Sequence, residues 1–237
     1  MDVLKDWMDN AAGECSLAIP SLFATNTGTS YIQLIRYMYD TARELLDRFD
    51  WANCTLDGTI TGDGSTSYSL ASDFKRLTRR DEESDPAVWS DDMRRAFRAV
   101  TSNGQWTVLQ SMGATPSYGY RIVGSTIEFT QAIASGETVT YSYISSGWIS
   151  HSAARTDEWQ GDADLTYLPG KLLELGTIWR WMRKRGLEFA SYQGEFEMLA
   201  SRLSTDDRGV KVIRMGDVPK AESPYASLPV PALGPAS

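Results

Sequence analysis

The stretch "LELGTIWRWMRKRGLEF", residues 173–189, decides how the C-terminal third of the chain folds. Together with Leu172 just before it, its apolar side chains recur at steps of three and four residues, at Leu175, Ile178 or Trp179, and Met182. This spacing predicts an amphipathic helix, and Gly186 ends the helix as a C-cap residue would. The apolar period then resumes. We therefore expect helices near 171–185 and 187–205, joined at Gly186 as an αα-hairpin or a sharp bend.

The same stretch places two tryptophans beside four basic residues, Arg180, Arg183, Lys184 and Arg185. Nucleic-acid binders use such a combination, but so does an ordinary amphipathic helix. Trp179 shares the apolar stripe and is expected in the core. Trp181 lies off the stripe and is expected to meet a neighbouring subunit or the β domain. The basic residues oppose the negative end of the helix macrodipole.

A second long helix is expected over residues 30–50. Ser30 and Gln33 have the spacing of a capping box. Apolar residues again recur at helical spacing, at Tyr31, Ile35, Met38, Ala42, Leu45 and Phe49. Residues 1–28 are interpreted as an N-terminal arm with a short helical piece in "VLKDWM".

The middle of the chain has a different character. "TVTYSYI" alternates with period two, which is typical of a half-buried strand, and "GDG" at 62–64 predicts a tight hairpin. "SDDMRRAFRAV" predicts a short helix capped by Ser90. We expect an α+β fold in which a helical bundle (29–54 and 165–207) carries an inserted small antiparallel β domain (55–150). An extended proline-rich C-terminal tail (208–237) follows.

Composition limits the function classes. The formal net charge of −8 argues against a general DNA or RNA binder, because non-specific affinity comes mainly from phosphate neutralisation. No run approaches the roughly 20 apolar residues of a membrane span, and the start of the chain lacks the apolar region of a signal peptide. Cys15 and Cys54 are expected to be small buried hydrophobes, with a disulfide or a redox site as alternatives.

Candidates for chemistry are few. His151 is the only histidine and is expected at the surface after a strand. The acidic run 157–164 is interpreted as a solvated loop, with a divalent-ion site or a glycosidase carboxylate pair as alternatives. The "GDGSTS" stretch lacks the lysine of a phosphate-binding loop. The basic run 75–80 is either a solvated face or a contact to an acidic partner. We predict no catalytic, cofactor or metal site, and therefore no enzyme.

Three segments, in this order, resemble the head–tail connector, or adaptor, family of tailed bacteriophages. "SYSLASDFKRL" resembles an extended leucine–small–x–Asp–Phe segment of the family. "YGYRIVGSTIEFTQAIASGETVTYSYISSGWI" resembles its central strand and turn pattern. "DADLTYLPGKLLELGTIWRWMRKRGLEFASYQGEFEMLASRL" resembles its C-terminal helix pair. The likeness covers roughly residues 30–206 and lies in hydrophobic pattern and turns.

The resemblance implies a virion structural protein without catalysis. Such proteins form a homo-oligomeric ring, usually a dodecamer, beneath the portal protein. The ring extends the channel through which double-stranded DNA passes, and it gives the next tail or nozzle protein a platform. It implies location at the head–tail interface of the virion after synthesis in the host cytoplasm. The candidates for ring or portal contacts are Arg79, Arg80, Trp181, Arg183, Lys184, Pro219, Tyr225 and Pro229.

The competing interpretation is a carbohydrate- or ligand-binding β module. It would present aromatic side chains together as an exposed patch. The candidates for that patch are Trp106, Tyr118, Tyr120 and Trp148.

Overall fold

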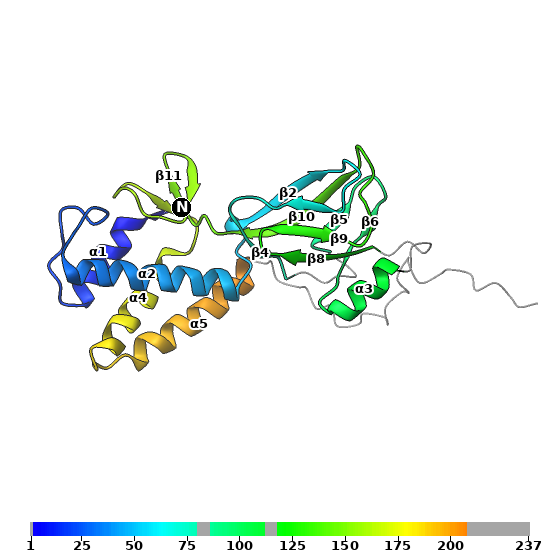
Figure 1. The fold of residues 1–237 in the computed structure, drawn as a ribbon. Coiled ribbons are helices and arrows are strands. Elements are labelled where there is room, and N and C mark those ends of the chain that lie inside the picture. Colours follow the sequence, from blue (N-terminus) through cyan, green and yellow to red (C-terminus); the bar gives the residue numbers. More distant parts are fainter. Residues whose placement is uncertain (1, 80–85, 112–117, 208–237) are drawn as a thin grey trace, which may run out of the picture.

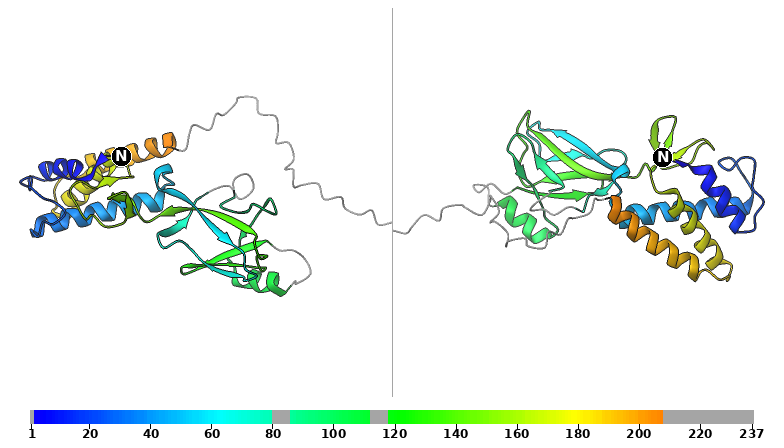
Figure 2. Two further views of the ribbon diagram at one scale, coloured as in Figure 1. Left: turned by 90° about the horizontal axis from the view of Figure 1, so that it is seen from above. Right: turned by 180° about the vertical axis from the view of Figure 1, so that it is seen from behind.

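A computed structural model describes residues 2–79, 86–111 and 118–207, which form two adjoining parts (Figure 1). The helical part comprises residues 2–54 and 146–207, and the β part comprises residues 55–145 between them. The two further views show the parts lying side by side along one long direction (Figure 2). None of the described helices is both long and apolar enough to cross a membrane.

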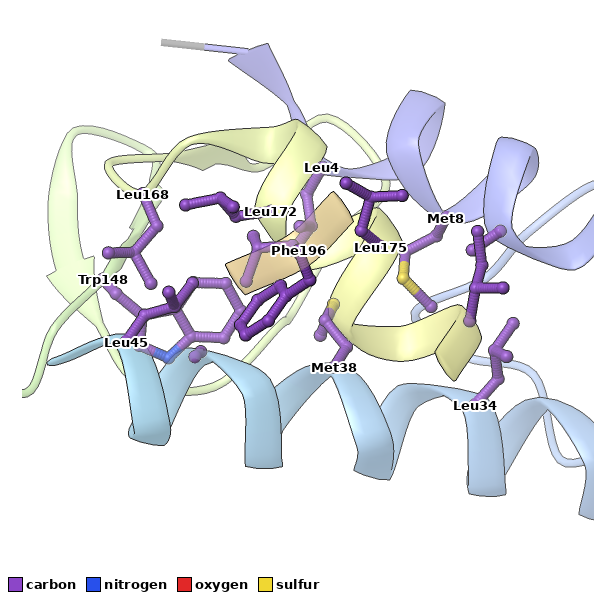
Figure 3. Close-up of a cluster of buried hydrophobic side chains, with 14 of the residues drawn as sticks. Leu4, Met8, Leu34, Met38, Leu45, Trp148, Leu168, Leu172, Leu175 and Phe196 are labelled. Atoms are coloured by element: carbon purple, nitrogen blue, oxygen red, sulfur yellow. The ribbon is translucent and has the colours of Figure 1, made fainter. Parts of the chain in front are cut away.

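Four helices build the helical part: α1 (Leu4–Glu14), α2 (Thr29–Arg48), α4 (Gly170–Lys184) and α5 (Ala190–Asp207). Helix α4 is central, since α1, α2 and α5 all pack against it. Its buried face meets theirs in one apolar core (Figure 3), which includes Leu4, Met8, Met38, Leu45, Leu172, Leu175 and Phe196.

Helices α2, α4 and α5 lie close to the ranges that the periodicity predicts. Gly186 has a φ of +70° between α4 and α5, a backbone conformation that favours glycine at a helix end. The capping box is wrong, because Gly28 occupies the N-cap position of α2 and no side chain caps that end. The expected arm also differs, since α1 buries Leu4 and Met8 completely against α4.

A small antiparallel sheet belongs to the helical part. It has the order β1 (Asp2–Val3), β13 (Leu165–Thr166), β11 (Ile149–His151) and β12 (Ala154–Thr156). Trp148 and Ile149 enter the helical core from this sheet. The start of the chain is thus paired with a segment that lies more than a hundred residues later.

The β part consists of two sheets that face one another. One has the order β2 (Thr55–Thr61), β10 (Thr138–Ser145), β5 (Val88–Ser90) and β6 (Arg95–Ala96), with β4 (Phe74–Leu77) also pairing with β10. The other has the order β3 (Ser67–Ser69), β9 (Thr126–Phe129), β8 (Gly119–Val123) and β7 (Arg98–Ala99). Side chains of both sheets share a second core, and helix α3 (Asn103–Ser111) lies at the end far from the helical part (Figure 1).

The expected fold class is wrong. The described residues hold thirteen strands in three antiparallel or mixed sheets together with five α-helices, and not a helical bundle with a small β insertion. Most strands have two to four residues. Such a strand is too short to produce a clear period-two signal, so its partners in the sheet decide its conformation.

Two local predictions fail for the same reason. The "GDG" turn does not close a hairpin, because β2 pairs with β10 and β3 pairs with β9 in the other sheet. The predicted helix at 90–100 forms strands β6 and β7. Ser90, its expected cap, donates its hydroxyl to Glu137 at 2.7 Å, and Phe97 is buried in the β core.

Candidate functional site

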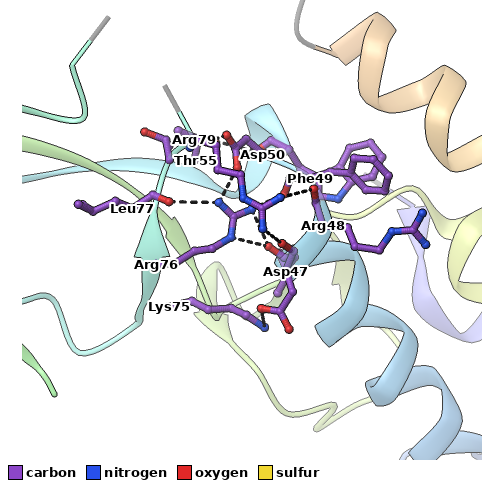
Figure 4. Close-up of polar contacts among 12 residues, drawn as sticks. Asp47, Arg48, Phe49, Asp50, Thr55, Lys75, Arg76, Leu77 and Arg79 are labelled. Carbon is purple, nitrogen blue, oxygen red and sulfur yellow. Dashed lines mark hydrogen bonds and ion pairs between the residues drawn. The ribbon is translucent and has the colours of Figure 1, made fainter. Parts of the chain in front are cut away.

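The C-terminal end of α2 is held by an arginine from the β part (Figure 4). Arg76 of β4 donates to the carbonyl oxygens of Leu46, at 2.8 and 3.0 Å, and of Phe49, at 2.9 Å. It also forms an ion pair with Asp50 at 2.6 Å. The last carbonyls of a helix lack partners within the helix and carry the negative end of its dipole. A guanidinium therefore stabilises this end and fixes the β part to it.

Arg79 belongs to the same junction, and the residue itself remains exposed. Its guanidinium donates to the carbonyl oxygens of Asp47, at 2.7 Å, and Arg48, at 3.1 Å, and its backbone N–H donates to Asp50 at 2.8 Å. The described part of the basic run 75–80 is therefore bonded to α2 within the chain. Arg80 lies outside the described residues.

Two carboxylates of the acidic run 157–164 have structural roles, whereas Asp157 and Glu158 are exposed, as the solvated-loop interpretation predicts. Asp162 accepts hydrogen bonds from the backbone N–H groups of Phe23 and Ala24. Asp164 is 4% exposed and accepts from the N–H groups of Gln160 and Gly161, both at 2.9 Å. These carboxylates close loops. Among the described residues, no three His, Cys, Asp or Glu side chains gather where they could hold a metal ion.

His151 supplies a further partner to Asp164. Its Nδ1 lies 2.7 Å from the carboxylate, which can only accept, so Nδ1 carries the proton. Burial raises the pKa of Asp164, but the hydrogen bonds from His151 and from the two backbone N–H groups outweigh it. The net result is a pKa below the usual range. The pair fixes the strand β11 to the loop before β13.

The two tryptophans of the opening stretch are both in the core. Trp179 is 8% exposed, as expected, and Arg180 lies over its ring at 4.3 Å. The prediction for Trp181 is wrong: it is 2% exposed and meets Tyr37 edge-on within the helical core. Arg185 covers its ring at 4.0 Å. Neither ring is therefore available to stack on a base or to contact another subunit.

Arg180 and Arg48 connect the helices through ion pairs. Arg180 of α4 pairs with Glu44 of α2 and donates to Thr41 at 2.8 Å. Arg48 of α2 pairs with Glu197 of α5, and this hydrogen bond lowers the pKa of the Glu197 carboxyl. Arg180 is therefore bonded within the helical part, unlike the exposed basic side chains at the end of α4.

The turn between α4 and α5 keeps its charges at the surface. Arg183 and Lys184 are exposed, and Leu187 beside them is 52% exposed. We call these three residues the basic tip. Arg183 lies 6.0 Å from the Trp179 ring centre. Of the predicted contact residues, Arg183 and Lys184 are exposed, and Arg79 is exposed but bonded to α2. Pro219, Tyr225 and Pro229 lie outside the described residues.

A cavity of about 370 Å³ lies at the opposite end of α5, and the sequence analysis missed it. Its acidic side chains are Asp2, Asp206 and Asp207, and its walls include Trp51, Tyr167 and Leu203. We call these six residues the acidic pocket. The adjacent acids Asp206 and Asp207 are visible in the sequence, but only the fold places Asp2 and Trp51 beside them.

The aromatic side chains of the alternative β module do not form an exposed patch. Trp106, Tyr120 and Trp148 are 3%, 7% and 2% exposed. Tyr118 is half-buried against Phe97, and Arg95 covers its ring at 4.3 Å.

The cysteines are free and buried, as expected. Burial raises the pKa of both thiols to about 12, which disfavours the reactive thiolate.

The comparisons with known proteins add no family name. No protein-family model matches the chain, and no curated protein matches it at a significant level.

Proposed function

We propose that this protein is a virion structural protein, a head-to-tail adaptor that forms a ring beneath the portal of a tailed bacteriophage. The ring extends the DNA channel and provides a platform for the tail. The ordered resemblance of three segments to connector proteins supports the proposal, and so does the way the chain joins its two parts.

The junction is the observation that carries the proposal. Arg76 and Arg79 bind the carbonyl end of α2, and β10 contributes to both cores, with Ile144 in the helical core and Tyr143 in the β core. An adaptor must hold one partner in a fixed orientation relative to another. Two cores joined through a buried strand and a charged helix end suit that role.

The charge distribution supports a channel protein that does not retain DNA. The chain carries a net charge of −8, and a negative wall repels the phosphate backbone. Trp179 and Trp181 are buried, so they do not offer bases a stacking surface. DNA would thus pass without sequence-specific binding.

The two other interpretations have less support. A sugar-binding face needs exposed aromatic rings, whereas three of the four candidate rings are buried. A hydrolase based on residues 157–164 needs carboxylates that are open to substrate, whereas Asp162 and Asp164 accept hydrogen bonds from backbone N–H groups.

The test is assembly with the portal protein of the same phage. We expect native mass spectrometry to show several copies of this chain bound to each portal ring, and negative-stain images to show added density at one end. An unrelated acidic protein replaces the chain as a control for non-specific association. Separate portal and adaptor species at micromolar concentrations would contradict the proposal.

A further inference from the structure

The helical part carries two charged surfaces of opposite sign that have no described partner of opposite charge. The basic tip presents Arg183 and Lys184, and the acidic pocket presents Asp2 and Asp206. In the other charged runs, Arg76 and Arg79 are bonded to α2, and Asp162 and Asp164 accept from backbone N–H groups.

The two surfaces cannot meet within one molecule. They lie at opposite ends of α5, which has 18 residues and is therefore about 27 Å long at roughly 1.5 Å per residue. The turn between α4 and α5 lies at the side of the helical part away from the β part, whereas α5 ends near the junction of the two parts (Figure 1). A contact between them must join two copies.

The basic tip and the acidic pocket also each have apolar groups that could pack against one another in a contact between copies. Leu187 is 52% exposed at the tip, and the pocket has apolar and aromatic walls that include Leu203, Trp51 and Tyr167. Aromatic rings and carboxylates together suit a lysine or arginine, whose alkyl stem packs on the ring while its charge pairs with the acid.

We infer that the basic tip of one copy inserts into the acidic pocket of the next. Lys184 and Arg183 pair with Asp206 and Asp2, and Leu187 packs on the pocket wall. Because the two surfaces differ, the contact is heterologous, and its repetition produces a ring when the rotation closes. This inference rests on the proposed ring and names the contact that builds it.

Disulfide trapping between two different variants tests the contact. One preparation carries Lys184→Cys, the other carries Asp206→Cys, and equal amounts are mixed with portal under mild oxidation. Only a contact between copies can join the two, and a disulfide needs Cα atoms within about 7 Å. Cys15 and Cys54 are buried and do not compete.

We expect covalent dimers from this mixture. The matched control replaces Asp206→Cys by Met198→Cys, which lies on the same helix and is 70% exposed, and should give no dimers above background. Rings on the portal without Lys184–Asp206 dimers would overturn the contact and leave the adaptor function standing. Dimers without portal binding would support the contact and contradict the adaptor function. If no assembly of any kind forms, both the contact and the adaptor function are contradicted.

Charge reversal gives a second readout. Lys184→Glu and Asp206→Lys should each weaken self-association about two- to fivefold per contact, as expected for exposed ion pairs. The double variant restores opposite charges at every contact and should recover most of the loss. Failure of the double variant to recover would count against the pairing.

The alternative occupant to be tested is the chain's own tail, which follows Asp207 in the sequence and carries Arg208, Lys211, Arg214 and Lys220. Replacing these four residues by serine in the full chain should leave the dimer yield unchanged. Dimers that form only after this replacement would show that the tail fills the pocket and would overturn the inference.

Discussion

Replacing Gly176 by alanine should separate α4 from α2. A Cβ atom at Gly176 would lie 2.1 Å from Cγ2 and 2.7 Å from Oγ1 of Thr41. Thr41 is completely buried, and its hydroxyl donates to the Tyr37 carbonyl and accepts from Arg180. Since a β-branched side chain in a helix has little rotational freedom, the added methyl group can be accommodated only by moving the helices.

The expected net loss of stability is about 1–2 kcal/mol. Overpacking a core costs about 1–3 kcal/mol, while replacing glycine by alanine within a helix returns up to about 1 kcal/mol. Gly194 of α5 provides the matched control, because a Cβ there would meet no atom within 4 Å. Gly194→Ala should therefore raise stability by about 0.5–1 kcal/mol, so the two variants should differ in sign.

Urea unfolding followed by tryptophan fluorescence measures both variants against the original chain. Equal slopes of the transitions are needed, because the two cores could unfold separately. The double variant Gly176→Ala/Thr41→Ala should show a favourable coupling above about 0.5 kcal/mol. If Gly176→Ala is as stable as the original chain, or if Gly194→Ala loses as much stability, the close contact between Gly176 and Thr41 does not hold α4 against α2.

Three other changes test the core, the junction and the buried carboxylate. Trp181→Ala should lower the free energy of unfolding by about 3–5 kcal/mol, measured by urea unfolding, because it empties a core site. Arg76→Ala should lower stability by about 1.5–3 kcal/mol and raise hydrogen exchange at the end of α2, because Asp50, whose side chain is 12% exposed, loses this guanidinium. The pKa of Asp164 is lower in the folded chain. The contribution of Asp164 to stability is therefore complete above its unfolded pKa of about 3.9 and disappears as the pH falls through the folded pKa. Asp164→Asn should therefore reduce the loss of stability at acidic pH, measured by urea unfolding at several pH values.

Each of these three predictions has an outcome that would contradict it. A Trp181→Ala chain of unchanged stability but weakened oligomers would restore its predicted role as a subunit contact. For the junction, Arg94→Ala on the exposed surface of the β part is the control, and equal exchange in both variants would contradict the role of Arg76. An unchanged acid profile in Asp164→Asn would mean that other carboxyls dominate acid unfolding.

The periodicity of the sequence predicted α2, α4 and α5, because the buried face of a long amphipathic helix gives apolar residues every three or four positions over several turns. Gly186 and the core position of Trp179 followed from the same local pattern. The short strands could not be predicted in this way. A strand of two or three residues such as β6 is defined by the partner to which it is bonded.

The sequence by itself determined helices α2, α4 and α5, the buried cysteines and the net charge, since each depends on residue type and on spacing within a few turns. Only the tertiary structure decided which charges remain accessible. Arg76 and Arg79 find carbonyl groups about 30 residues away, and Asp162 finds N–H groups nearly 140 residues away. The acidic pocket likewise joins the start of the chain to the end of α5. A run of charged residues does not show from the sequence which groups its side chains will contact, because the packing of the two cores decides which elements lie next to it.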